Sequence, residues 1–103
     1  MQNYKLVPAA EKDLEIIWLY TVQEWGIRQA EDYIDQMDEA FQLIAGQPLM
    51  CREQQGGGAP VRIHHQAHHL IVHTIETDSI TVIRICMKAW ILMGNYWANI
   101  GKK

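Results

Sequence analysis

The fold is decided by residues 61–87, which read VRIHHQAHHLIVHTIETDSITVIRICM. Apolar and polar residues alternate here with the period of two that is typical of β-strands. We expect an antiparallel three-stranded meander, with strands over 61–65, 68–76 and 80–87 and two-residue turns at 66–67 and 77–78. Neither Gln66-Ala67 nor Thr77-Asp78 is a favoured turn pair, so the register that these turns impose is a hypothesis.

This register separates the side chains of the meander into two faces. We expect one face to pack on helices: Val61, Ile63, Leu70, Val72, Ile83, Ile85 and Met87. The other face, which we expect to point outward, carries Arg62, His64, His69, Ile71, His73, Arg84 and Cys86. A slip of one residue would bury both arginines, and this supports the chosen register.

Two helices are predicted upstream of the meander, after a short strand over residues 3–7. Pro8 suits the first turn of a helix that runs to about Trp25, and Gly26 is a plausible terminator. A second helix follows at once and ends at Gly46. So short a connection predicts an antiparallel helical hairpin. Residues 47–60, which include three consecutive glycines, are expected to form a loop.

Length and composition narrow the class of protein. The chain has 103 residues, which fit one domain over 1–103, and a net charge of −3. A pI of about 5.9 argues against direct nucleic-acid binding. The two cysteines match no zinc or redox spacing, and no apolar run approaches the ~20 residues that span a bilayer. We therefore expect a cytoplasmic protein without a membrane segment.

Few residues indicate chemistry. In the predicted register His64, His69 and Cys86 share a row, and all three are zinc-ligand types. Adjacent strands lie ~4.8 Å apart, so the outer two would be about 10 Å apart, too far for one ion. Ser79 and Cys51 stand in no nucleophile motif. We assign no catalytic residue, metal site or cofactor.

Several short segments, in this order and spacing, carry a resemblance to a known family. They are YKLVPAA at 4–10, DLE at 13–15, IWLY at 17–20, Trp25-Gly26 with Gln29-Ala30, Pro48, Arg52, VRI at 61–63, HLIV at 69–72 and ITVIRI at 80–85. The chain resembles the ParE branch of the RelE/ParE toxins of bacterial type II toxin–antitoxin modules. The resemblance implies an α+β fold with an N-terminal strand, an antiparallel helical hairpin, and an antiparallel three-stranded meander packed on the helices.

The resemblance also implies a function. ParE-type toxins are associated with plasmid stabilisation and with poisoning DNA gyrase, and a cognate antitoxin neutralises them. The resemblance implies either a toxin–antitoxin hetero-oligomer or a toxin homodimer. On this basis we expect gyrase to be contacted by Arg52, Arg62, Arg84, Lys88 and His73. We expect the antitoxin to contact Trp90, Ile91, Leu92, Tyr96 and Trp97.

Two alternatives stay open. RelE-type relatives are ribosome-dependent mRNA endoribonucleases, and Arg62, Arg84 and His73 are the candidates for that chemistry. A degenerate toxin that retains only antitoxin binding is the other alternative. Met87 stands where the family commonly has a histidine, and Ile91 roughly where it commonly has an aspartate. An inhibitory binding protein is preferred over an enzyme.

Overall fold

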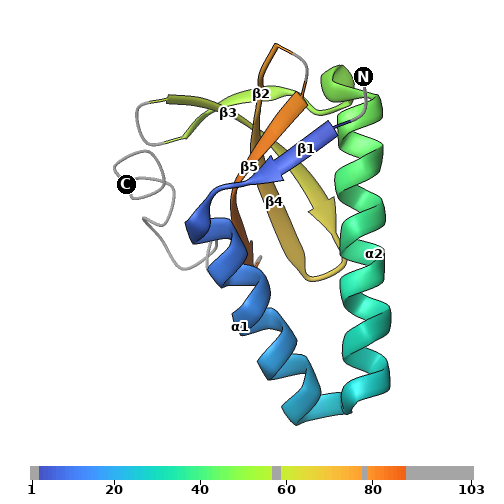
Figure 1. The fold of residues 1–103 in the computed structure, drawn as a ribbon. Coiled ribbons are helices and arrows are strands. Elements are labelled where there is room, and N and C mark those ends of the chain that lie inside the picture. Colours follow the sequence, from blue (N-terminus) through green and yellow to red (C-terminus); the bar gives the residue numbers. More distant parts are fainter. Residues whose placement is uncertain (1–2, 57–58, 78, 88–103) are drawn as a thin grey trace.

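The computed structural model describes residues 3–56, 59–77 and 79–87 (Figure 1). A short strand precedes two long helices, and a 3-10 turn and further strands follow them. The elements are β1 (Asn3–Leu6), α1 (Pro8–Trp25), α2 (Ile27–Gly46), η1 (Pro48–Met50), β2 (Glu53–Gly56), β3 (Ala59–Gln66), β4 (His69–Ile75) and β5 (Ser79–Met87). None of the helices in these ranges is long and apolar enough to cross a membrane.

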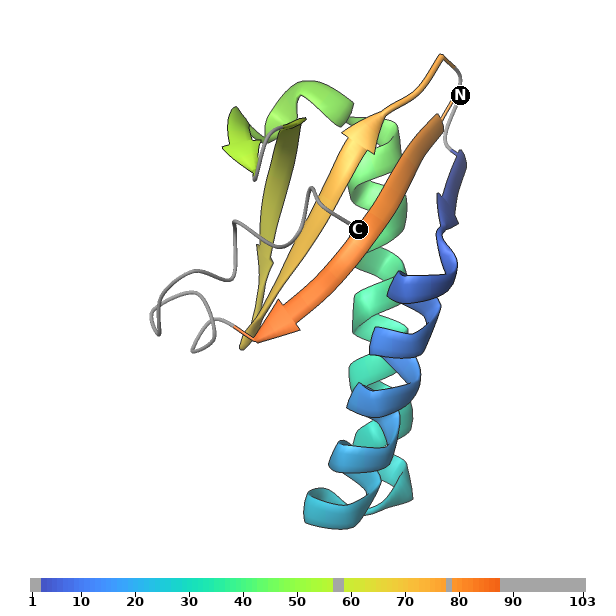
Figure 2. The same cartoon turned by 90° about the vertical axis from the view of Figure 1, so that its left-hand side faces the viewer.

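The described strands form one sheet in the order β1-β5-β4-β3-β2. β1 pairs with β5 in parallel, and the other neighbours are antiparallel. Both helices lie on one side of this sheet (Figure 2). The expected α+β fold is confirmed. The expectation of a plain loop over 47–60 is wrong, because η1 and β2 lie within it.

The hairpin of α1 and α2 follows from its local sequence. Pro8 is the first residue of α1, and Val7 before it is extended and makes no side-chain cap. The two helices share Gly26 as their boundary residue, which has φ +96°. This backbone conformation favours glycine. The chain therefore reverses tightly at Gly26, and α2 runs back along α1.

The main core lies between the helices and the sheet. Its buried members are Ala10, Ile17, Met37, Ala40, Phe41, Ile44, Ala45, Ile71, Ile80, Val82 and Ile85. The ring of Tyr4 contacts that of Phe41, with centroids 5.1 Å apart, and its hydroxyl donates to Asp38. β1 is thereby fixed to α2 as well as to β5.

The first hairpin is shifted by two residues from the predicted register. Ile63, rather than Val61, pairs with Val72, and the turn lies at Ala67 and His68. Ala67 has φ +53°, a conformation that this turn requires. A shift of two preserves the side-chain alternation, so the grouping of residues on these two strands by face is unchanged.

The second hairpin contains a bulge that the sequence did not signal. His73 pairs with Val82, but Val72 pairs with Arg84, so Ile83 is the extra residue on β5. The register of the far half is therefore one step away from the predicted one. As a result Ile85 lies opposite Ile71, and both join the core under the helices.

The predicted assignment of faces is wrong for most of the meander, although Ile85 lies on the helix side and Cys86 on the other side as expected. A second buried cluster consists of Val61, Ile63, Leu70, Val72 and Cys86, with Ile83 packed against it. Leu70 and Val72 alternate with Ile71, which faces the helices, so this cluster lies on the opposite side of the sheet. Both faces carry buried apolar residues, and alternation alone therefore could not identify the inner one.

Candidate functional site

The buried carboxylate of Asp13 on α1 binds β5 at Arg84 and Ile85. Asp13 accepts hydrogen bonds from Arg84 Nε at 2.8 Å and from Arg84 Nη2 at 3.1 Å. It also accepts from the backbone N–H of Ile85 at 2.9 Å. β1 pairs with β5 only as far as Val82, so Asp13 serves as the acceptor where the neighbouring strand ends. The side chain of Arg84 is 32% exposed and that of Asp13 is 8% exposed.

This pair changes the role predicted for Arg84. An outward guanidinium was expected to contact a target, whereas the structure joins it to α1 across 71 residues of sequence. Asp13 entered the prediction only as part of the DLE segment of the resemblance, without a role of its own. One signal pointed to burial, because Asp13 lies three residues after Ala10 and four before Ile17, both in the buried stripe.

Arg62 lies on the helix-facing side of the sheet, where it holds the segment after η1. Its Nη1 donates to the backbone oxygen of Cys51 at 2.6 Å. The Sγ of Cys51 in turn lies 3.8 Å from Nδ1 of His64. Burial raises the pKa of the Cys51 thiol, and the charge of Arg62 opposes this. The predicted outward position of Arg62 is therefore wrong, since the arginine is half-buried and bonded within the fold.

His69 forms a second link between the helices and the sheet. Its Nδ1 lies 2.6 Å from the hydroxyl of Tyr33 on α2, and the two rings are 5.5 Å apart. Burial lowers the pKa of His69 and raises the pKa of Tyr33. A neutral imidazole that accepts from a protonated phenol fits both directions.

His73 is fully buried, so it cannot contact a target in this structure, and that prediction is corrected. Its ring points to the helix side, where Nδ1 lies 3.2 Å from the oxygen of Ile71. Burial lowers the pKa of His73 to about 4. Among the described residues its Nε2 has no hydrogen-bond partner. The ring is therefore neutral near pH 7, with Nδ1 as the donor.

The other predicted contact residues fall into two groups. Arg52 is exposed, directly before β2. Lys88 and the predicted antitoxin contacts lie outside the described residues: Trp90, Ile91, Leu92, Tyr96 and Trp97. Within the described chain the structure brings Arg62 and His73 together as a cross-strand pair, with Arg84 held separately by α1.

The three side chains considered above as zinc ligands, those of His64, His69 and Cys86, do not lie together. His64 and His69 lie on the helix side of the sheet, whereas Cys86 belongs to the cluster on the opposite side. Over residues 3–56, 59–77 and 79–87, no group of three or more His, Cys, Asp or Glu side chains is placed to hold a metal ion.

Comparison with known proteins assigns the family. The model of "ParE toxin of type II toxin-antitoxin system, parDE" matches residues 4–87. The chain belongs to the ParE toxin family. This match covers every described helix and strand except the first residue of β1, and it includes both partners of the Asp13–Arg84 pair.

Two relatives of this ParE chain are named Toxin ParE1. The protein from Caulobacter vibrioides is 29% identical over 85 residues, which are 82% of this chain and 88% of that protein. The protein from Mycobacterium tuberculosis is 32% identical over 86 residues, 81% of this chain and 86% of that one. Similarity therefore extends over most of each protein.

A solved structure shows the same fold. It is described as the chromosomal ParDE TA system from P. aeruginosa, and one of its chains superposes with a TM-score of 0.70. The match covers 84% of this chain and 96% of that chain at 17% sequence identity. At this identity the likeness concerns the fold, and it agrees with the two helices and five strands described here.

Proposed function

We propose that this protein acts by binding DNA gyrase and inhibiting it without chemistry. The protein is the toxin component of a ParDE type II toxin–antitoxin system, as its family match over residues 4–87 indicates. Gyrase is the target with which ParE-type toxins are associated. Inhibition by binding requires only that the toxin prefers one state of its target over another.

This proposal rests on the positions of the residues considered for nuclease chemistry, which are buried or bonded within the fold. His73 is fully buried, and Arg84 is bonded to Asp13. A ribonuclease would need a proton-transfer group and a cation that reach the scissile phosphate. His73 instead lies buried beside the backbone of its own strand and Arg84 is joined to α1, which favours a binding toxin over a RelE-type nuclease.

We place the gyrase contact on the basic residues predicted for it that remain accessible. Arg52 is exposed, and Arg84 retains part of its surface at the rim beside α1. We include Lys88 in the proposed gyrase contact, because it follows β5 directly in the sequence. Arg62 would act indirectly, by holding the segment at Cys51 that precedes Arg52. Trp90, Ile91, Leu92, Tyr96 and Trp97 remain our proposed contacts for the antitoxin.

The test compares two activities of the purified toxin. One is supercoiling of relaxed plasmid by gyrase, and the other is the integrity of message in a cell-free translation reaction. Loss of supercoiling with intact message supports the proposal. Cleaved message with normal supercoiling would establish the nuclease instead, and neither effect together with tight antitoxin binding would establish a degenerate toxin.

Variants separate contact residues from structural ones. Arg52→Ala is expected to weaken gyrase inhibition while the melting temperature stays within about 4 °C, since surface substitutions usually change stability by less than about 0.5 kcal/mol. Glu53→Ala, one residue further on and also exposed, is the matched control. Equal inhibition by Arg52→Ala and the wild type would remove Arg52 from the contact surface.

A further inference from the structure

A cavity of about 240 Å³ lies where β3 separates from β4. Pairing between these strands ends at Arg62 and His73, although β3 extends back to Ala59 and β4 extends on to Ile75. The start of β3 pairs with β2 instead, and Figure 1 shows it leading away from the end of β4. The cavity between the separated strands is lined by Glu53, Pro60, Val61, Arg62, Thr74 and Ile75. It is therefore a feature of the sheet, to which the helical hairpin contributes no lining residue.

The guanidinium of Arg62 brings to this cavity a positive charge that no described carboxylate neutralises. Its Nη1 donates to the oxygen of Cys51, whereas Nε and Nη2 have no hydrogen-bond partner among the described residues. No Asp or Glu oxygen in the described ranges lies within 4.0 Å of this guanidinium. Arg84, which is half-buried as well, is paired with Asp13. Because charged side chains that are partly removed from water are usually paired, the uncommitted N–H groups of Arg62 indicate an anionic ligand.

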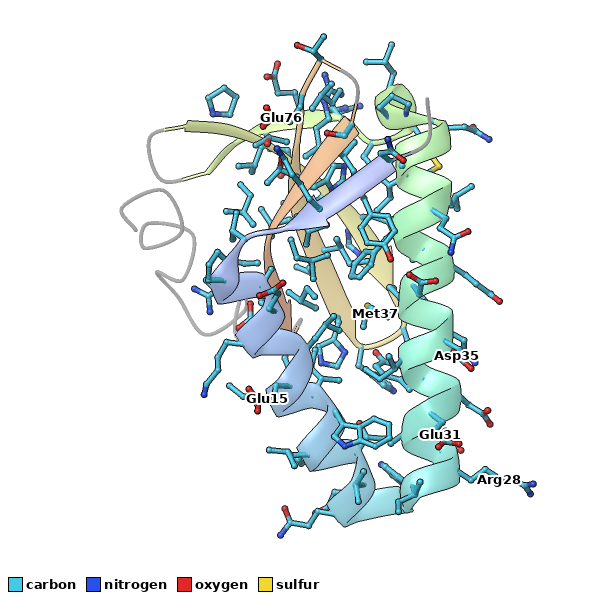
Figure 3. All side chains as sticks on the ribbon, in the orientation of Figure 1. Glu15, Arg28, Glu31, Asp35, Met37 and Glu76 are labelled. Carbon is cyan, nitrogen blue, oxygen red and sulfur yellow. The ribbon has the colours of Figure 1, made fainter. Side chains whose placement is uncertain are left out.

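The acidic side chains around the cavity do not supply this partner. Glu53 lies opposite Arg62 in the pairing of β2 with β3, but it is exposed and forms no ion pair with the arginine. Glu76, just after β4, accepts a hydrogen bond from Thr81 at 3.1 Å. Figure 3 shows Glu31 and Asp35 projecting from α2 away from the sheet. A carboxylate for Arg62 therefore has to come from outside the described residues.

The shape and charge of the cavity favour one carboxylate over other anions. The N–H groups of Nε and Nη2 form a planar fork that matches the two oxygens of a carboxylate. Thr74 brings to the same cavity a hydroxyl that has no hydrogen-bond partner in the part of the chain that the structure describes. Glu53, which also lines the cavity, repels a second negative charge and so disfavours a phosphate dianion. The volume of about 240 Å³ is below the ~300–1,000 Å³ of most small-molecule sites, so the ligand is small.

We propose that this cavity binds a single carboxylate group, with Nε and Nη2 of Arg62 as paired donors and the hydroxyl of Thr74 as a further donor. Two sources present this chemistry. One is a free monocarboxylic acid of a few carbon atoms, and the other is an aspartate or glutamate side chain of another protein. The site is distinct from the gyrase contact proposed on Arg52, Arg84 and Lys88, and it does not depend on the identity of the toxin's target.

Titrations of the ¹⁵N-labelled full-length toxin, followed by NMR, test the site and distinguish the two sources. The probes are acetate, propionate and N-acetyl-aspartate N-methylamide, with phosphate as the comparison anion and chloride holding the ionic strength constant. The carboxylates should shift the backbone signals of Val61, Arg62 and Thr74 and the Arg62 Nε–H signal, and they should saturate in the millimolar range, as expected for ligands of so few atoms. Tighter binding of the blocked aspartate than of propionate assigns the site to a protein side chain, and the reverse order assigns it to a free acid.

Variants of the lining residues change the affinity in opposite directions. Thr74→Val removes the hydroxyl at nearly constant shape and should weaken propionate binding about fivefold or more. Thr81→Val is the matched control, because Thr81 is the half-buried partner of Thr74 on β5 but does not line the cavity, and its affinity should stay within about 1.5-fold. Glu53→Gln removes the repelling charge and should tighten binding about twofold at low salt, a gain that loss of structure does not produce.

Arg62→Lys keeps the charge without the planar fork and should weaken binding about tenfold, with circular dichroism checking that the fold is retained. Absence of saturable shifts with all three carboxylates would refute the site. Phosphate that binds as tightly as propionate would show a general anion site, and equal effects of Thr74→Val and Thr81→Val would show that the cavity is not where the anion binds. Either result overturns the assignment. Since no measurement here includes gyrase, these outcomes are independent of the supercoiling assay.

Discussion

Asp13→Ala should destabilise the protein more than any other single change to a charged residue on α1. The substitution removes the acceptor of three hydrogen bonds, two from Arg84 and one from the Ile85 N–H. A buried backbone N–H left without a partner costs about 1–3 kcal/mol. Loss of one member of a buried ion pair costs about 3–5 kcal/mol, but Arg84 is a third exposed and water can replace part of that.

The combined loss is therefore about 3 kcal/mol, a large part of the ~5–15 kcal/mol that stabilises a typical domain. In a domain of this size it corresponds to a fall in melting temperature of roughly 12–24 °C. Urea unfolding followed by tryptophan fluorescence measures the free energy, and circular dichroism gives the melting temperature. Asp13→Asn keeps one acceptor for the Ile85 N–H and should lose about half as much.

Asp35→Ala is the matched control, because Asp35 is an exposed helical aspartate on α2. It should change the free energy of unfolding by less than about 0.5 kcal/mol. The double variant Asp13→Ala, Arg84→Met should show coupling, with a loss smaller than the sum of the two single losses. An Asp13→Ala protein within about 1 kcal/mol of the wild type would refute the reasoning.

Three further predictions concern two histidines of the sheet and the turn between α1 and α2. Burial lowers the pKa of His73 to about 4, so the unfolded chain takes up the proton first as the pH falls. The free energy of unfolding should therefore decline between pH ~6.5 and ~4, by up to about 3 kcal/mol from this residue, and His73→Phe should flatten the decline; parallel curves would contradict this. Tyr33→Phe removes the hydrogen bond to His69 and should lower the free energy of unfolding in urea by about 1 kcal/mol. An unchanged urea midpoint would contradict this. Gly26→Ala should cost about 1–3 kcal/mol in the same assay from backbone strain alone, because Gly26 has φ +96° and ψ 168° and a Cβ there meets no atom within 4 Å. A stabilised variant would show that the turn adopts another conformation.

Local patterns in the sequence were sufficient to predict the helices and the meander. Pro8 and Gly26 mark the bounds of α1 because each fits a backbone conformation that the helix ends require. The alternation in residues 61–87 indicates strands because their side chains lie alternately on two faces. β2 had no such signal, since its residues are polar and glycine, and it pairs only because β3 lies beside it.

The choice of face depended on contacts between distant residues, which a single sequence does not reveal. The bulge at Ile83 shifts the strand partner of Arg84 by one residue, and no turn residue or glycine in the sequence indicates this bulge. Several polar residues of the inner face have partners on the helices or the segment after η1, whereas His73 contacts only the backbone of its own strand through Nδ1. Examples are His69 with Tyr33 and Arg62 with the backbone of Cys51. The structure differs from the prediction in the orientation of Arg62, His73 and Arg84, and the contact roles of the site residues stay predictions.

The stoichiometry of gyrase inhibition tests the central claim most directly. Free toxin is titrated against a fixed concentration of purified gyrase in the supercoiling assay, and excess antitoxin is added afterwards. A toxin that only binds should inhibit in proportion to the gyrase occupied, and supercoiling should return when the antitoxin removes it. Inhibition by toxin far below the gyrase concentration that persists after the antitoxin is added would contradict a binding mechanism and would require a catalytic one.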